Sequence, residues 1–288
     1  MAEAVRLIRL EVGGTWTAEQ EAEVRAVAGG LAVEFTGVPG PARAWAGAEL
    51  RWVHSWAAGV DGLTGWREAT VVTSAKGNGA VPLAEHAMLL TLMLDRDAAR
   101  WAAAQAGRRW ERRTHSELLG RTMGILGLGR AGRELRTRAE AFGMPVVALR
   151  RDHSPADLDA FCTASDVLVV CAPLTDETRG MLGDRQFDQL GPTGHYVCVS
   201  RGGIADDAAL LRALQENRIA GAGLDAHAVE PLPEDSPFWD LPNVIVTPHN
   251  GATTPGTARR GFEIFLGNLG RFIRGEGLEH RVDVEAGY

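Results

Sequence analysis

A glycine-rich turn between two short apolar runs constrains this chain more than any other feature. Residues 123–126 (MGIL) form an apolar run that is too short for a helix and is bounded by glycines, so they predict a buried strand. Residues 130–141 favour a helix, and residues 146–149 (VVAL) predict a second strand. Between the first strand and the helix, Gly127, Gly129 and Gly132 have the spacing G-x-G-x-x-G. A glycine turn of any α/β protein is the alternative, but the surrounding βαβ pattern favours dinucleotide binding.

Each glycine has a separate physical reason. Gly127 allows a tight turn, Gly129 lets the backbone approach a pyrophosphate, and Gly132 lets the helix pack closely on the strand. The first turn of the helix offers unpaired N–H groups and a partial positive charge to the phosphates. We therefore expect the following turn residues to bind the cofactor: Gly127, Leu128, Gly129, Arg130, Ala131 and Gly132.

The end of the second strand distinguishes NADP from NAD. An acidic residue there suits the ribose of NAD, whereas arginine suits the 2′-phosphate of NADP. This chain has Arg150 and Arg151 directly after Leu149, and two guanidiniums can hold a phosphate through charge-assisted bonds. The sequence therefore favours NADP. NAD remains the alternative cofactor if Asp152 is the acidic residue that binds the ribose. The two arginines could also be a solvated surface pair with no role in cofactor binding.

Composition indicates a globular protein without nucleic-acid or membrane partners. The 288 residues carry a net charge of −7, and 45% are hydrophobic. The basic run 108–113 (RRWERR) favours a solvated face or a subunit contact over a nucleic-acid surface. Cys162, Cys171 and Cys198 lack metal-binding spacing, so we expect free thiols in a reducing cytosol and no metal site. No signal or membrane-spanning segment is evident, and a cytoplasmic location is expected.

The rest of the chain alternates apolar runs with helical segments. This alternation predicts an α/β fold with a doubly wound, mainly parallel Rossmann sheet and a second, smaller, discontinuous flavodoxin-like domain. We expect residues 96–255 to bind the dinucleotide, and residues 1–95 with 256–288 to bind substrate. Further strands are expected at 5–12, 31–35, 51–54, 69–73, 166–171, 196–200, 220–224 and 244–247. Further helices are expected at 17–28, 42–50, 83–106, 155–162, 206–216 and 257–273.

Three polar residues follow predicted strands and suit one reaction. These residues are Arg201, Glu230 and His249. Arginine can clamp a carboxylate and polarise a neighbouring carbonyl, and a histidine beside a carboxylate can deliver a proton. With hydride from a nicotinamide, these groups could reduce a 2-keto acid. Each residue also has an alternative without a catalytic role. Arg201 could form a surface ion pair, Glu230 could be an ordinary loop residue, and His249 could be a turn residue.

The chain also resembles the D-isomer-specific 2-hydroxyacid dehydrogenase family. Matching stretches run, in order, from SWAAGVD at 55–61 through AEH at 84–86, residues 119–132, PLTDETRGML at 173–182, VSRGGIA at 199–205 and GLDAHAVEP at 223–231 to FWDLPNVIVTPHNG at 238–251. The resemblance implies that Arg201, Glu230 and His249 are catalytic and that Asp225 contacts the nicotinamide carboxamide. It implies further cofactor contacts at Ala172, Pro173, Thr178 and Val199. It also implies that backbone amides of two loops hold the substrate carboxylate, with residues Ala57, Ala58, Gly59, Lys76 and Gly77.

Several alternatives remain open. The resemblance implies a homodimer acting on a small 2-keto acid, with glyoxylate and hydroxypyruvate the leading substrates. A phosphoglycerate-type dehydrogenase is a second possibility, with Lys76 the one obvious cation in the expected substrate loops. A dinucleotide-sensing protein similar to the corepressors that resemble this family is a third.

Overall fold

The chain divides into two compact units, each described here by itself. The structure is a computed structural model and describes residues 7–12, 16–37, 52–60 and 71–283. One unit comprises Met1–Asn78 and Pro255–Tyr288, and the other comprises Gly79–Thr254. From the sequence we expected the first boundary after residue 95, within the helix expected at 83–106. In the structure that helix, α2 (Ala80–Asp95), belongs to the second unit.

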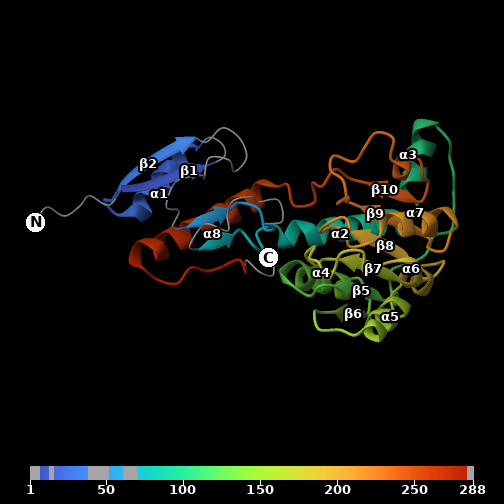
Figure 1. Cartoon of the computed structure of the whole chain (residues 1–288). Helices are drawn as coiled ribbons and strands as arrows, with labels where there is room; N and C mark the ends of the chain where they lie inside the picture. Colours follow the sequence, from blue (N-terminus) through green and yellow to red (C-terminus); the bar gives the residue numbers. More distant parts are fainter. Residues whose placement is uncertain (1–6, 13–15, 38–51, 61–70, 284–288) are drawn as a thin grey trace, which may run out of the picture. The chain divides into compact units, whose positions relative to one another are not determined.

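The second unit is built on one parallel sheet of six strands (Figure 1). Its order is β10-β9-β8-β7-β5-β6, and every neighbouring pair is parallel. The strands are β5 (Met123–Leu126), β6 (Val146–Leu149), β7 (Val167–Val170), β8 (His195–Cys198), β9 (Gly221–Leu224) and β10 (Val244–Val246). The predicted doubly wound Rossmann sheet is confirmed.

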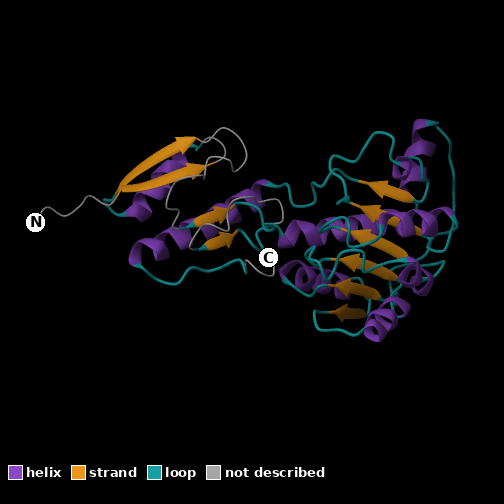
Figure 2. Ribbon diagram, viewed as in Figure 1, coloured by secondary structure: helices purple, strands orange, loops and turns teal. Residues whose placement is uncertain are grey.

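Helices cover both faces of this sheet (Figure 2). Within β7, Leu168 and Val170 contribute to one core, whereas Val167 and Val169 contribute to the other. This alternation buries the strand on both faces and explains why its sequence is apolar throughout. One face packs against α5 (Pro155–Thr163), α6 (Asp184–Leu190) and α7 (Asp207–Gln215), and the other packs against α2 and α4 (Arg130–Ala141).

The expected long helix at 83–106 is wrong in one respect, because the structure breaks it in two. Helix α2 ends at Asp95, and α3 (Ala98–Ala106) begins after Asp97. Asp97 has a φ of 53°, in the left-handed region that aspartate tolerates better than most side chains do. Two short helical segments, α6 and η3 (Pro237–Trp239), were not predicted, because they span too few turns for a periodic pattern.

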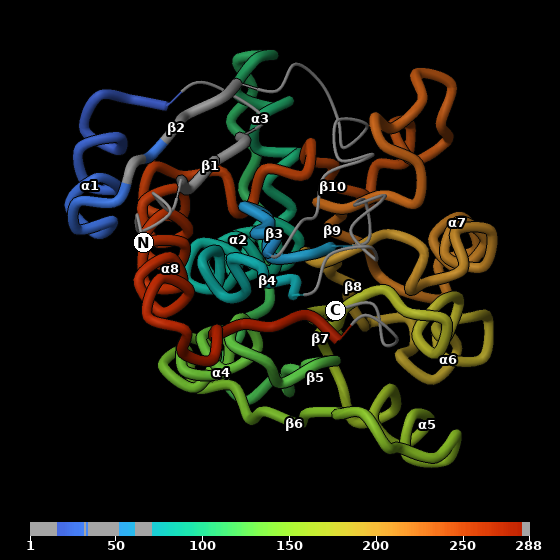
Figure 3. The backbone as a smooth tube through the Cα atoms, turned by 60° about the vertical axis from the view of Figure 1, so that its left-hand side comes forward, coloured from blue at the N-terminus to red at the C-terminus, as the bar shows by residue number. Residues whose placement is uncertain are grey.

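The first unit joins both ends of the chain, as expected for a discontinuous domain. Helix α1 (Ala18–Ala28) lies beside α8 (Pro255–Arg274), and their contact buries Val24, Phe265 and Leu269 (Figure 3). Parallel pairs join β1 (Leu7–Val12) to β2 (Ala32–Gly37) and β3 (Val53–Ser55) to β4 (Val72–Ser74). The helix expected at 42–50 lies outside the described residues. None of the helices described in either unit is long and apolar enough to span a membrane.

Candidate active site

Most predicted site residues of the second unit lie just beyond the carboxyl ends of its strands. Arg201 follows β8, Asp225 follows β9 and His249 follows β10. Because these strands are parallel and adjacent, their carboxyl ends share one edge of the sheet. Ligands of open α/β sheets bind at this edge.

His249 and Glu230 form a direct pair. The His249 Nδ1 atom lies 2.8 Å from Oε2 and 2.9 Å from Oε1 of Glu230. The backbone N–H of His227 also donates to Glu230 Oε1, at 2.9 Å. Burial raises the pKa of Glu230, but the hydrogen bonds from His227 and His249 outweigh burial and lower its pKa overall. Glu230 is therefore an ionised acceptor near neutral pH, so Nδ1 carries a proton and Nε2 is the atom left for a reactant.

The loop that carries Arg201 packs against the segment that leads to Glu230. A Cβ atom added to Gly202 would lie 1.9 Å from the backbone carbon of His227, so only glycine permits this approach. The Arg201 guanidinium donates to the Ser200 carbonyl at 2.8 Å and is half-buried. The structure thus joins Glu230 to His249 directly, and it joins their segment to the Arg201 loop through backbone packing.

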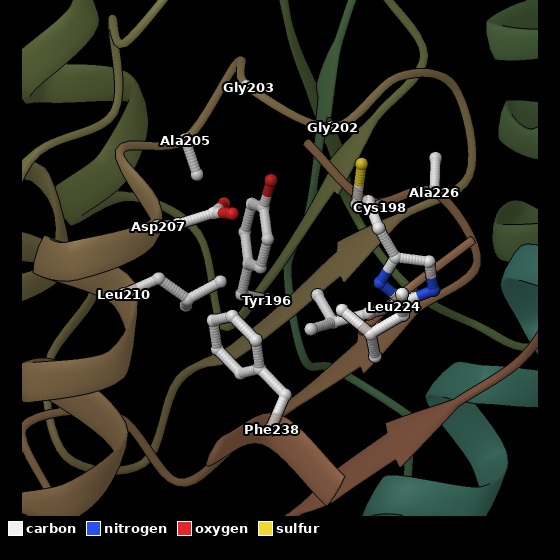
Figure 4. A pocket seen from close by; sticks show the side chains of 12 residues that line it. Tyr196, Cys198, Gly202, Gly203, Ala205, Asp207, Leu210, Leu224, Ala226 and Phe238 are labelled. Atoms are coloured by element: carbon white, nitrogen blue, oxygen red, sulfur yellow. The ribbon is translucent and has the colours of Figure 1, made fainter. Parts of the chain in front are cut away.

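A small cavity lies under this loop (Figure 4). Its volume of ≈ 20 Å³ is enough for about one water molecule. Figure 4 shows the Asp207 carboxylate directed towards Tyr196, whose hydroxyl points up towards the loop of Gly202 and Gly203, with Phe238 below them. A volume that holds about one water molecule is too small for an organic substrate.

The glycine turn has the shape that its sequence predicts. Gly127 has a φ of 96°, and a Cβ there would lie 2.7 Å from the Ala172 nitrogen at the end of β7. A Cβ on Gly132 would lie 2.3 Å from the Gly127 carbonyl oxygen. At Gly129, the described part of the chain places no atom within 4 Å of such a Cβ and no side chain that caps α4. The exposed first turn of α4 is consequently open to an anion, as a pyrophosphate requires. Leu128, Arg130 and Ala131 fill the intervening positions of the turn.

The two arginines after β6 differ in their surroundings. Arg151 holds Glu177 through two hydrogen bonds, each 3.1 Å long. Arg150 is exposed, and within the described residues its guanidinium makes no ion pair. Both members of the Arg151 pair are more than half exposed, so the pair adds little stability and can open. Because Glu177 already engages Arg151, the Arg150 guanidinium is the more accessible of the two to a phosphate.

Three of the predicted cofactor residues have structural partners of their own. The Thr178 hydroxyl donates to the Pro173 carbonyl at 2.8 Å and accepts from the Thr175 amide at 2.8 Å, which closes the loop after β7. Val199 is only 2% exposed and packs in the core. Cofactor contacts by Pro173, Thr178 and Val199 stay predictions.

Comparison with known proteins assigns the family. The model of the NAD-binding domain of D-isomer specific 2-hydroxyacid dehydrogenases matches residues 88–251, which include the glycine turn, Arg201, Glu230 and His249. The chain belongs to the D-isomer specific 2-hydroxyacid dehydrogenase family. Its second unit is accordingly an NAD-binding domain.

Individual relatives of this family differ in length and name. A glyoxylate reductase of Korarchaeum cryptofilum is 33% identical over 79% of this chain and 74% of its own length. A D-3-phosphoglycerate dehydrogenase of Archaeoglobus fulgidus is 36% identical over 64% of this chain, which spans only 37% of that relative. The solved D-isomer specific 2-hydroxyacid dehydrogenase of Xanthobacter autotrophicus Py2, in complex with NADPH and MES, superposes with a TM-score of 0.84. That structure is 27% identical, and the match covers 98% of this chain and 100% of that one.

The loops that the family resemblance assigns to substrate lie side by side in the first unit. Ala57, Ala58 and Gly59 follow β3, whereas Lys76 and Gly77 follow the neighbouring strand β4. The Ala75 amide donates to the carbonyls of Ser55 at 2.8 Å and Ala57 at 3.3 Å, which ties one loop to the other. Gly77 has a φ of 92°, which explains a glycine there. Their role in binding a carboxylate stays a prediction.

Asp225 has a role that the sequence analysis missed. Its side chain is fully buried, and the carboxylate accepts hydrogen bonds from the Thr247 hydroxyl at 2.6 Å and from the amides of Asn250 at 3.1 Å and Gly251 at 3.0 Å. His86 lies 3.3 Å from the same carboxylate. Asp225 therefore holds the backbone that follows His249. The proposed contact of Asp225 with the nicotinamide carboxamide stays a prediction.

A pair of glycine variants separates cofactor binding from folding. Gly129→Ala should leave thermal stability unchanged, because its Cβ meets no protein atom, but should weaken NADPH binding by about tenfold or more, since the Cβ occupies the pyrophosphate approach. Gly132→Ala should instead lower the free energy of unfolding by about 1–3 kcal/mol, because its Cβ meets the Gly127 carbonyl. Thermal melts and NADPH fluorescence titrations measure both. Unaltered NADPH affinity in Gly129→Ala would contradict the assignment of the turn.

Asp225 predicts a specific pH dependence of stability. Burial raises the pKa of Asp225, but hydrogen bonds from His86, Thr247 and Gly251 lower it far below its ordinary value. Its folded-state pKa is therefore below the unfolded value of about 4, and its stabilising contribution is complete above that pH and is lost on acidification. Asp225→Asn should cost about 1–3 kcal/mol above about pH 5, and the deficit should shrink below about pH 4. Urea unfolding from pH 7 to pH 3 measures this, and a deficit that is constant with pH would contradict it.

Proposed function

We propose that this protein is an NAD(P)H-dependent reductase that interconverts small 2-keto acids and D-2-hydroxy acids. The observation that carries the proposal is the His249–Glu230 pair, 2.8 Å apart, at the carboxyl edge of an NAD-binding domain of this family. Glyoxylate and hydroxypyruvate are the proposed substrates. The glyoxylate reductase of Korarchaeum cryptofilum supports this choice, because the alignment covers 74% of that relative.

The proposed mechanism assigns one task to each side chain. The bound nicotinamide supplies or accepts the hydride. Arg201 holds the substrate carboxylate and polarises the ketone oxygen through charge-assisted hydrogen bonds. His249 donates a proton to that oxygen from Nε2, because Nδ1 is engaged by Glu230. The Glu230 carboxylate stabilises the imidazolium and fixes the ring orientation.

A phosphoglycerate-type dehydrogenase is the second candidate. Its support is the 36% identity to the enzyme of that name from Archaeoglobus fulgidus. Because the chain spans only 37–43% of the length of three such relatives, that likeness is partial. A screen of 2-keto acids and 3-phosphohydroxypyruvate with NADPH and NADH, followed by nicotinamide absorbance, separates these candidates. Tight cofactor binding without turnover of any acid would favour the dinucleotide-sensing alternative instead.

Removing the proposed proton donor should abolish most of the turnover. His249→Ala should lower kcat for keto-acid reduction by about 10²–10⁴-fold, because general acid catalysis contributes that much. NADPH affinity should be unchanged, since the glycine turn is intact. Glu140→Ala is the control: Glu140 lies in the last turn of α4, its side chain is 49% exposed and pairs with Arg136 of the same helix, and full activity is expected. Survival of kcat in His249→Ala would refute the assignment.

The cofactor preference should depend on Arg150. We propose that NADP is preferred and that Arg150 binds its 2′-phosphate, in keeping with the NADPH complex of the Xanthobacter autotrophicus relative. Arg150→Asp should shift kcat/KM from NADPH towards NADH, because it replaces the phosphate partner with a ribose partner. Arg151→Ala should have a smaller effect, since Glu177 already engages Arg151. Equal or better use of NADH by the unaltered protein would contradict the proposal.

The homodimer and the substrate loops of the first unit stay predictions. The exposed aromatic side chains of the segment after α2 offer a surface for a second copy of the chain: Trp110 is 93% exposed and Trp101 is 46% exposed.

A further inference from the structure

His86 is the one imidazole in α2, a helix whose other residues are apolar apart from Glu85, Thr91 and Asp95. Its side chain is only 13% exposed. The stretch AEH at 84–86 carried part of the family resemblance, yet the proposed mechanism gives His86 no task. Its surroundings indicate one.

The His86 ring joins a short chain of hydrogen bonds. Its Nε2 atom lies 3.0 Å from the Thr247 hydroxyl oxygen and 3.3 Å from Oδ1 of Asp225. The Thr247 hydroxyl donates to Asp225 at 2.6 Å, so this oxygen is left to accept from His86. His86 is therefore the donor at Nε2, and it orients both the hydroxyl and the carboxylate.

These groups determine the conformation around His249. The Asp225 carboxylate accepts the amides of Asn250 and Gly251, the two residues directly after His249. His249 itself has a φ of 50°, in the left-handed region that is unfavourable for non-glycine residues. Such a conformation persists only where its neighbours hold it. A Cβ on Gly251 would lie 3.0 Å from the His86 ring, so the ring also packs directly against this turn.

We propose that His86 is a positioning residue for His249, acting through Thr247 and Asp225. The proposal rests on the proposed function, since it assigns to His86 the alignment of the proton donor. Loss of the His86 donor lets the turn at 249–251 shift, and misplacement of a catalytic group by about 1 Å can cost as much as 10²-fold in rate. His86 lies outside the glycine turn, so the proposed pyrophosphate contacts of that turn do not depend on it.

The test compares variants with and without the hydrogen-bond donor. His86→Leu should lower kcat for keto-acid reduction by about 10- to 100-fold, with an unchanged KM for NADPH. His86→Gln keeps an amide donor and should recover most of kcat. Thr247→Val should lower kcat as His86→Leu does, whereas Thr247→Ser keeps the hydroxyl and should remain active. If His86→Leu does not fold, the two Thr247 variants test the proposal. Unchanged kcat in the donor-free variants, or equal losses in donor-free and donor-bearing variants, would overturn the proposal.

A readout without turnover separates this proposal from the proposed function. Amide hydrogen exchange at Asn250 and Gly251 should become faster in His86→Leu and Thr247→Val than in the unaltered protein and the donor-bearing variants, while protection in the strands β5 and β7 stays the same. Unchanged exchange would refute the role of His86 even if the protein reduces keto acids. Faster exchange in a protein that turns over no acid would instead refute the proposed function and leave the anchoring of the turn intact.

Discussion

The parallel direction of six strands is the constraint on which the rest of this structure depends. Because every strand of the second unit points the same way, its carboxyl ends share one edge, and loops far apart in sequence meet there. The glycine turn follows β5, the loop that carries Arg201 follows β8, and the turn at 249–251 follows β10. The four central strands β5, β7, β8 and β9 are buried along their whole length, and this close packing supports the short loops that carry the polar groups.

Two carboxylates at this edge have opposite surroundings and consequently separate tasks. Glu230 is 37% exposed and pairs with the His249 imidazole at 2.8 Å. Asp225 is fully buried and accepts hydrogen bonds from two backbone amides and a hydroxyl. Burying an ionised carboxylate without hydrogen-bond partners would raise the free energy of the folded state. The ionised form of Asp225 therefore favours the one backbone conformation that supplies these partners. Asp225 thus holds the turn after His249, whereas the proposed mechanism assigns to Glu230 the stabilisation of the His249 imidazolium.

Glycines make the approaches between these loops possible. Gly202 brings the Arg201 loop onto the segment before Glu230, and Gly132 brings α4 onto the turn after β5. At both positions a single methyl group would collide with backbone atoms, which cannot move aside as a flexible side chain could. Gly129 differs because its surroundings are open, and its lack of a side chain is useful only if something outside the chain approaches it.

The sequence by itself determined the fold class, the order of the strands along the chain and the glycine turn, because apolar period and glycine spacing are local properties. It also suggested Arg201, Glu230 and His249 as catalytic residues by their places after predicted strands, and that role stays a proposal. The break at Asp97, the partners of Asp225 and the place of His86 were decided only by the tertiary structure. His86 and Thr247 are 161 residues apart, and no local pattern can show that a helix brings an imidazole to the end of a distant strand. Such contacts depend on the packing of the whole sheet, which the chain acquires only when it folds.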